Sequence, residues 1–459
     1  MISLWLLQAA PLGAQGAALD TPLGERLVGV LGMATMVAIA WALSNNRARV
    51  PWRLVGIGVA LQAALGFLVL KTGVGRGLFR GANVVFTKLL GFTEQGARFV
   101  FGNLARTNVP VGTPGGAPAD MAPLGEPTAW AATGAYFAFG VLPTIIFFSS
   151  LMSVLYYLGL MQRVVQGMAW VFQRLLGTSG AETLSATGNI FVGQTEAPLL
   201  IKPFVHTMTV SELNTVMVGG FATIAGGVMA AYVGMLSPYF PDIAGHLLTA
   251  SVMNAPAGLL ISKILVPEVG QPATRGAVAV KIEKTDANVI EAAASGAAQG
   301  LQLALNVGAM LLAFIALIAL VNFGVGGLAG LVGIEHLSLE RIFGWVLAPL
   351  AWLMGVPWSD AGQIGSLIGV KVVVNEFVAY LQLAGVAGAG ETVLSPRGMV
   401  IATYALLGFA NFSSIAIQIG GIGGLAPERR GDLARLGLKA MIGGNLAAFM
   451  SASLAGMLA

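Results

Sequence analysis

The chain has 459 residues, of which 56% are apolar and only 10% are charged. Soluble globular domains carry about 25% charged residues, so this composition excludes an ordinary soluble protein and indicates a chain embedded in lipid. Cysteine is absent, which excludes disulfides, thiolate metal sites and a cysteine nucleophile. The net charge of +4 does not point to a nucleic-acid partner, because the basic residues lie at the ends of apolar segments, as topology signals do.

The N-terminus has an apolar stretch and small residues, but it lacks the positively charged start of a signal peptide. We therefore interpret residues 1–26 as an exported N-terminal tail. Eight apolar runs near or above the roughly 20 residues needed to cross a bilayer follow. They cover residues 28–43, 54–70, 129–160, 209–236, 243–265, 292–321, 398–424 and 436–458. Two further apolar stretches, 179–204 and 357–383, are interrupted by Gly, Asn, Gln, Thr and Glu and are predicted to be re-entrant hairpins.

The lysines and arginines predict the orientation of the chain. They cluster after the first, third and fifth runs and before the last, and all four clusters fall on one side if both termini are periplasmic. The chain is then a multi-pass protein of a bacterial-type inner membrane. Residues 76–98 mix apolar and charged positions and suit an external helix lying in the membrane interface, and residues 160–176 suit a second such helix on the cytoplasmic face.

An internal repeat relates the two halves of the chain. The sequence GFATIA at 220–225 recurs as GFANFS at 408–413, each time in the middle of a run that follows an interrupted segment. Each interrupted segment also carries one acid, Glu196 or Glu376, which we expect to be buried. Broken segments in corresponding positions are typical of the midplane site of a secondary transporter. An odd number of runs separates the two copies, so the repeat is predicted to be inverted.

A carboxylate near the bilayer centre costs at least about 2.5–3.5 kcal/mol, so Glu196 and Glu376 are the first candidates for function. The alternative is that each acid has a structural role only and links the two arms of its hairpin by hydrogen bonds to the backbone. The polar neighbours supply donors and acceptors without positive charge, which suits a neutral ligand with sugar hydroxyls and an amide-bearing ring. These neighbours are Asn189, Gln194, Thr195, Asn375, Asn411, Ser413 and Ser414. Lys202 and Lys371 are interpreted as interfacial residues whose ammonium groups reach toward water.

Broken helices also leave backbone carbonyls free, and a dehydrated Na⁺ needs such oxygens at close range. Asn189, Val192, Thr223 and Ile224 lie in the two places where these oxygens could converge. Ordinary helix capping at a glycine-rich kink is the alternative interpretation.

Four segments, 188–204, 251–268, 375–380 and 410–430, closely resemble the concentrative nucleoside transporter family in the same order. The resemblance covers roughly residue 129 to the C-terminus. It implies a homotrimer in which a transport domain moves as an elevator against a scaffold. It also implies that Gln194 and Thr195 bind the base, with Val228 packing nearby and Phe409 lining the pocket. The ribose would be bound by Glu196, Glu376, Asn411 and Ser414.

The same resemblance implies that Asn189, Val192, Thr223 and Ile224 form a Na⁺ site. Thr223 replaces the serine expected at one ion position, which leaves coupling to H⁺ open. The predicted fold is an all-α integral membrane protein with about eight transmembrane helices, two opposed re-entrant hairpins in an inverted repeat, and interfacial helices. The scaffold is expected to comprise residues 27–160 and 271–334. The two transport repeats are expected at 161–270 and 335–459.

The resulting hypothesis is a Na⁺-driven symporter, not an enzyme, that imports nucleosides, with membrane lipid and further copies of itself as partners and no nucleic acid. An H⁺-coupled symporter is the first alternative. An intramembrane hydrolase using the two acids lacks any recognisable hydrolase motif or nucleophile, and a channel is the remaining alternative.

Overall fold

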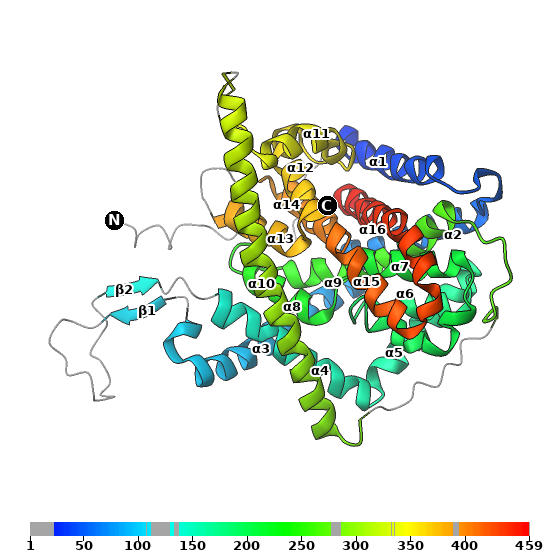
Figure 1. Cartoon of the computed structure of the whole chain (residues 1–459), viewed down its shortest axis with the longest axis horizontal. Helices are drawn as coiled ribbons and strands as arrows, with labels where there is room; N and C mark the ends of the chain where they lie inside the picture. Colours follow the sequence, from blue (N-terminus) through cyan, green and yellow to red (C-terminus); the bar gives the residue numbers. More distant parts are fainter. Residues whose placement is uncertain are drawn as a thin grey trace.

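The computed structural model describes residues 23–106, 108–111, 129–132, 137–276, 286–331, 333–334, 336–388 and 394–458. Most of the predicted N-terminal tail, residues 1–22, lies outside the described residues. Apart from turns and loops, the described residues are helical except for one antiparallel pair of strands, β1 (Asn108–Val111) and β2 (Ala129–Ala132), which projects from the helical body (Figure 1). The expected all-α class is confirmed.

The eight predicted runs correspond to helices or pairs of helices, but the run 129–160 was predicted to begin too early: its first residues form β2, and the helix begins at Phe137. The unbroken ones are α1 (Leu23–Ala42), α2 (Trp52–Lys71), α4 (Leu142–Tyr157) with the preceding π-helix η3 (Phe137–Val141), α9 (Ile243–Leu265), α10 (Val289–Gly330) and α16 (Arg430–Leu458). The broken ones are α7 (Val210–Ala222) with α8 (Gly226–Leu236), and α14 (Pro396–Leu406) with α15 (Phe412–Leu425). Among the described residues, six helical segments are long and apolar enough to cross a membrane without counting a bent pair; α1 and the α14–α15 pair are not among them.

The two predicted interfacial segments each form one helix, α3 (Gly73–Phe101) and α5 (Leu160–Leu176). The buried residues of α5 recur every three to four positions and form one apolar stripe: Met161, Val165, Ala169, Phe172 and Leu176. Gly159 and Gly177 stand at its two ends with φ of +77° and +69°. Only glycine adopts this left-handed backbone readily, so the two glycines define where α5 begins and ends.

Both interrupted segments form helical hairpins. Hairpin 1 consists of α6 (Gly180–Gly188) and the 3₁₀-helix η4 (Ala197–Thr207), and hairpin 2 consists of α12 (Trp358–Val373) and α13 (Glu376–Gly388). Ser179 and Glu182 form a reciprocal capping box that begins α6. The sequence did not predict α11 (Leu339–Leu353) as a separate helix; it packs on α12 at an angle of 117°.

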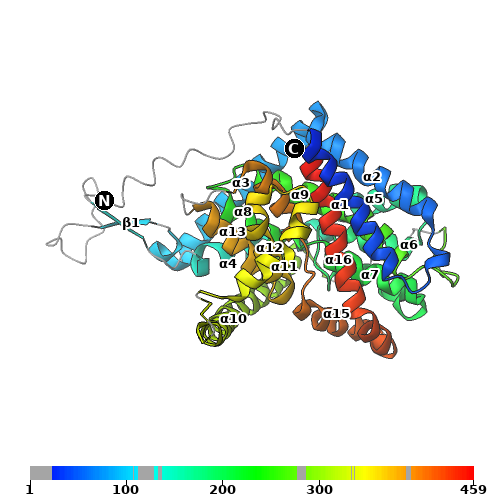
Figure 2. The same cartoon turned by 90° about the horizontal axis from the view of Figure 1, so that it is seen from above.

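The core lies around α7, α9 and α16, whose apolar spans are more than four-fifths buried. α16 packs against α1, α7, α9 and α14, so the C-terminal helix joins both halves of the chain. α10, by contrast, runs along the outside of the body and packs mainly on α4 (Figures 1 and 2). The short 3₁₀ turns η1 (Arg47–Arg49), η2 (Gly102–Ala105) and η5 (Pro427–Arg429) complete the described elements.

Candidate functional site

The two broken spans meet at their breaks. The first break is Thr223 to Ala225, between α7 and α8, and the second is Leu407 to Asn411, between α14 and α15. The backbone N–H of Phe409 donates a hydrogen bond of 3.3 Å to the carbonyl of Thr223. The two non-helical segments are therefore in direct contact inside the protein.

Side chains from the following helices bind the carbonyls beside these breaks. Asn254 of α9 donates to the carbonyl of Ala222 at 2.6 Å, and Asn445 of α16 donates to the carbonyl of Ala410 at 2.9 Å. Asn411 accepts from the backbone N–H of Ser414 at 2.9 Å and so caps α15. The free backbone groups that a broken helix leaves are satisfied by specific amides, which keeps the breaks ordered.

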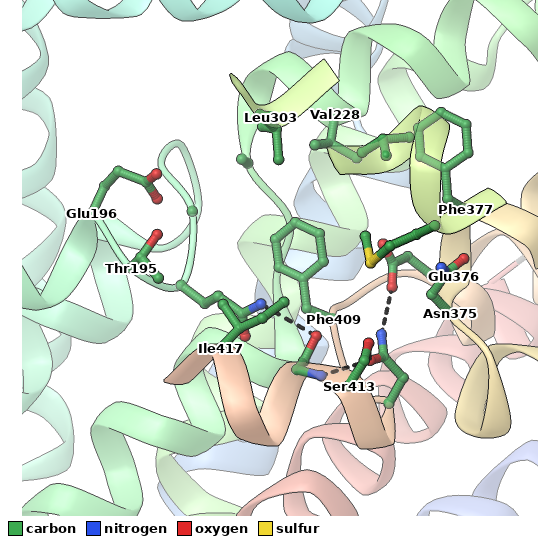
Figure 3. A pocket seen from close by; sticks show the side chains of 17 residues that line it. Thr195, Glu196, Val228, Leu303, Asn375, Glu376, Phe377, Phe409, Ser413 and Ile417 are labelled. Atoms are coloured by element: carbon green, nitrogen blue, oxygen red, sulfur yellow. Dashed lines mark hydrogen bonds between the residues drawn. The ribbon is translucent and has the colours of Figure 1, made fainter. Parts of the chain in front are cut away.

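A cavity of about 120 Å³ lies beside the breaks, between the tips of the two hairpins (Figure 3). Its walls come from hairpin 1, α8, α10, hairpin 2 and α15. The lining residues are Gly193, Gln194, Thr195, Glu196, Ala225, Val228, Leu303, Val307, Met310, Asn375, Glu376, Phe377, Phe409, Asn411, Ser413, Ser414 and Ile417. All eight residues that the sequence proposed for cargo binding are among them.

The two acids lie on opposite sides of this cavity (Figure 3). Glu376 is buried, with 4% of its surface exposed, and its carboxylate accepts from the Tyr232 hydroxyl at 3.1 Å and from the Asn411 amide at 2.9 Å. Glu196 is exposed, so the expectation that both acids are buried is wrong for this one. It follows Thr195 in the tip of hairpin 1, where the chain has left α6.

Gln194 connects hairpin 1 to the second broken span. Its amide nitrogen donates to the Ser414 hydroxyl at 3.2 Å, and its amide oxygen accepts from Gln418 at 3.0 Å. Gln418 also donates to the carbonyl of Met217 in α7 at 3.2 Å. A chain of amide and hydroxyl groups thus crosses from the hairpin tip to both broken spans.

The sequence reading missed several of these residues. Gln418 could have been noticed as a polar residue within the apolar run 415–425, whereas Tyr232 resembles an ordinary core aromatic residue. Lys371 was predicted to reach the interface, and this is wrong: its side chain is fully buried and its ammonium donates to the carbonyls of Ala405 and Leu407. Lys202, by contrast, is exposed.

The four residues proposed for a cation lie where the tip of hairpin 1 meets the first break. The backbone N–H of Gly226 donates to the carbonyl of Phe191 at 3.0 Å, which joins the tip to the break beside Val192. Asn189 is buried, and its side-chain oxygen has no hydrogen-bond partner in the described structure. Thr223 and Ile224 are buried in the break itself. Amide and carbonyl oxygens without a competing ammonium suit a small hard cation.

This architecture, a cavity between two re-entrant hairpins and two broken spans, defines a polytopic membrane transporter. Residues 31–104 match the family described as "Na+ dependent nucleoside transporter N-terminus", and residues 246–456 match its C-terminus. Residues 138–239 match a domain described as "Nucleoside recognition". The chain belongs to the Na⁺-dependent concentrative nucleoside transporter family, which is a family of transporters and not of enzymes.

Its relatives come from bacteria and animals. The chain is 46% identical to an uncharacterized transporter of Haemophilus influenzae, covering 94% of this chain and 97% of that one. It is 43% identical to nucleoside permease NupC of Helicobacter pylori over 94% and 97% of the two chains. It is also 40% identical to the mouse sodium/nucleoside cotransporter 1, covering all of this chain and 68% of the mouse protein.

Solved structures of CNTnw have the same fold. The inward-facing, substrate-bound state gives a TM-score of 0.82 at 44% identity, covering 94% of this chain and 97% of that one. A variant in an outward-facing state also gives 0.82, at 43% identity and the same coverage. A variant in an intermediate state gives 0.83 at 44% identity, over 94% and 99% of the chains. The predicted helical fold with re-entrant hairpins is confirmed.

Proposed function

We propose that this protein imports nucleosides across a bacterial-type inner membrane as a symporter driven by a Na⁺ gradient. The observation that carries the proposal is the cavity itself. It combines a buried carboxylate, amides from both halves of the chain and an apolar wall, and no lysine or arginine is among the described residues that line it. This chemistry suits a neutral ligand with one hydroxylated end and one flat aromatic end better than it suits an anion.

The cargo would be oriented by the two ends of the cavity. Glu376, Asn411 and Ser414 would bind the ribose hydroxyls, together with Glu196 from the opposite side. Gln194 and Thr195 would bind the polar edge of the base, because an amide and a hydroxyl offer both donors and acceptors. Phe409 and Val228 would pack against the ring.

Na⁺ would be a second cargo, bound by Asn189, Val192, Thr223 and Ile224. The partnerless oxygen of Asn189 is the observation that favours a cation there, since a buried acceptor without a donor is costly. Gln194 and Thr195 lie in the same hairpin tip as Val192, so an ion that orders this tip would also position two base-binding residues. Coupling requires the ion to bind more tightly to the form of the protein that binds nucleoside than to the form that does not.

Transport would proceed by an elevator movement. The proposed moving unit comprises residues 161–270 and 335–459, and the proposed scaffold comprises residues 27–160 and 271–334. Inward-facing, intermediate and outward-facing structures of CNTnw support alternating access in this fold. α10 carries large exposed apolar residues such as Leu312 and Phe323, which would face lipid or the other subunits of a homotrimer.

The test is uptake of labelled uridine and adenosine by proteoliposomes with the Na⁺ and pH gradients imposed separately. The proposal expects saturable accumulation against a nucleoside gradient when Na⁺ is high outside. Accumulation driven by the pH gradient alone would show that H⁺, and not Na⁺, is the coupling ion. Equilibration without accumulation would indicate a channel, and conversion of the labelled nucleoside would indicate an enzyme. Reactivity of single cysteines introduced at the two ends of the chain would test their periplasmic placement.

A further inference from the structure

Gln418 of α15 is fully buried next to Gln194, a residue of the cavity wall, and its amide nitrogen makes two hydrogen bonds. This nitrogen donates to the carbonyl of Met217 at 3.2 Å and to the side-chain oxygen of Gln194 at 3.0 Å. The side-chain oxygen of Gln418 has no hydrogen-bond partner among the described residues. The orientation of this amide is therefore set by its two N–H groups.

The Met217 carbonyl fixes the direction of this chain of hydrogen bonds. A backbone carbonyl can only accept, so the Gln418 group that faces it has to be the NH₂ group. The Gln194 group that faces the same NH₂ group then has to be the oxygen. The NH₂ group of Gln194 is left to donate to the Ser414 hydroxyl, at 3.2 Å. Reversing either amide would set two oxygens or two NH₂ groups against each other.

Close packing also holds the two amides in place. Gly220 of α7 lies against both side chains, because a Cβ added there would be 2.8 Å from the Gln418 nitrogen and 3.0 Å from the Cβ of Gln194. Gln418 has no exposed surface, and Gln194 exposes only 6% of its own. Movement of either amide is therefore opposed by packing as well as by hydrogen bonding.

The fixed amide of Gln194 offers a donor and an acceptor in one order. An amide has two N–H groups and two oxygen lone pairs, so after the bonds to Ser414 and Gln418 one of each remains for cargo. The N–H lies on the side of Ser414, which is proposed to bind the ribose, and the oxygen lies on the side of Gln418. Thr195 imposes no order, since a hydroxyl rotates either to donate or to accept.

We propose that Gln418 is a positioning residue: by fixing the amide of Gln194, it makes the base site select an acceptor next to the ribose bond and an N–H donor beyond it. The proposal rests on the proposed function, because it uses the nucleoside position given above. Uracil and thymine present this order with O2 and N3–H. Cytosine presents O2 and an N3 without hydrogen, which would face the oxygen of Gln194. Cytidine is therefore the disfavoured nucleoside.

The experiment measures a ratio of two affinities, because a general loss of folding or of ribose binding cancels in the ratio. Uridine and cytidine carry the same ribose and differ only at positions 3 and 4 of the base. The binding of each is measured on the purified full-length protein with Na⁺ present. Gln418→Met removes the donor, and Gly220→Ala displaces it. Gln62→Met is the matched control, since Gln62 is also a fully buried glutamine but donates to Ser451 of α16, outside the cavity wall.

The wild type and Gln62→Met should bind uridine about 3- to 10-fold more tightly than cytidine, the difference expected from one neutral hydrogen bond. In Gln418→Met and Gly220→Ala the ratio should fall close to 1, because Gln194 can then offer its amide in either order. Uridine should lose affinity in both variants, whereas cytidine should keep or gain affinity. Gln62→Met and Gln418→Met should both melt at a lower temperature, but only Gln418→Met should change the ratio.

An unchanged ratio in Gln418→Met would overturn the proposal, and so would a wild-type protein that binds cytidine as tightly as uridine. If Gln418→Met does not fold, Gly220→Ala and the wild-type ratio decide the question. The proposed function is judged separately: a wild-type protein that binds neither nucleoside would reject it, whereas equal binding of both would reject only the role of Gln418.

Discussion

Tyr232 donates a hydrogen bond of 3.1 Å to the carboxylate of Glu376, from a position 144 residues away in the chain. Tyr232 belongs to α8 of the first broken span, and Glu376 begins the second arm of hairpin 2. The tyrosine ring is stacked on that of Tyr380 at 4.3 Å, which holds its hydroxyl in place. The acid of the second repeat is therefore oriented by a side chain of the first.

Removing this hydroxyl should weaken cargo binding. In Tyr232→Phe the carboxylate of Glu376 loses the hydroxyl donor and keeps the Asn411 amide, and a hydrogen bond to a charged group contributes about 1.5–3 kcal/mol. We expect nucleoside affinity to fall about 10-fold or more, measured by calorimetry and by uptake into proteoliposomes. Tyr380→Phe is the control: its hydroxyl donates to the carbonyl of Thr403, so it should lower the melting temperature more than the affinity. Equal affinities for the wild type and Tyr232→Phe would show that the bond does not orient the acid.

The charge of Glu376 should be essential. In Glu376→Gln one carboxylate oxygen becomes an NH₂ group, which would face the donor of either Tyr232 or Asn411. Uptake should be abolished while size-exclusion chromatography still shows the folded oligomer. Glu196→Gln should retain more activity, because Glu196 is exposed and its replacement leaves no buried donor without an acceptor. Normal transport by Glu376→Gln would remove this acid from the mechanism.

The contact between the two breaks depends on Gly408. Its φ is +108°, and an added Cβ would lie 2.5 Å from the carbonyl oxygen of Phe221. Gly408→Ala therefore introduces backbone strain of about 1–3 kcal/mol and a clash that pushes the breaks apart. We expect a lower melting temperature in detergent together with a loss of nucleoside binding. Gly420→Ala in α15 is the comparison, since its Cβ would meet no neighbour and should leave both measurements unchanged. A fully active Gly408→Ala protein would mean that the breaks can separate without harm.

Lys263 should be the main electrostatic contact at the base of hairpin 1. Its ammonium lies 2.7 Å from the carboxylate of Glu182 and 3.4 Å from that of Glu268, with almost no exposure of Lys263 or Glu182. Removing one partner of a buried ion pair leaves an uncompensated charge and costs about 3–5 kcal/mol. Lys263→Met should therefore unfold at a markedly lower temperature, and Glu182→Gln in the same chain should recover part of the loss.

Arg98→Met removes one partner of the exposed pair between Arg98 and Glu94, so its melting temperature should stay close to that of the wild type. An equal effect of the Lys263 and Arg98 substitutions would contradict a structural role for the buried pair.

The sequence predicted the spans because long apolar runs have few alternatives in lipid, and it predicted the breaks because GFATIA and GFANFS interrupt such runs. It could not predict burial within the protein. Glu196 and Glu376 looked alike, yet one is exposed and the other is enclosed by Tyr232 and Asn411, since burial depends on which helices pack over a tip. The environment of Lys371 was also predicted wrongly, because its carbonyl partners lie more than 30 residues away in the chain. The four cation-site residues and the cargo-binding roles stay predictions.

Leu303, Val307 and Met310 form the part of the cavity wall that α10 supplies. If α10 stays still while the rest of the cavity moves, the contact between a nucleoside and these three side chains has to break during each transport event. A synthetic nucleoside analogue with a rigid, apolar extension packed against these side chains would contact the stationary scaffold and the moving transport domain at the same time. Such a compound should compete with nucleosides for the cavity and also prevent the movement of the transport domain. Contact with this wall would therefore distinguish an inhibitor from a substrate.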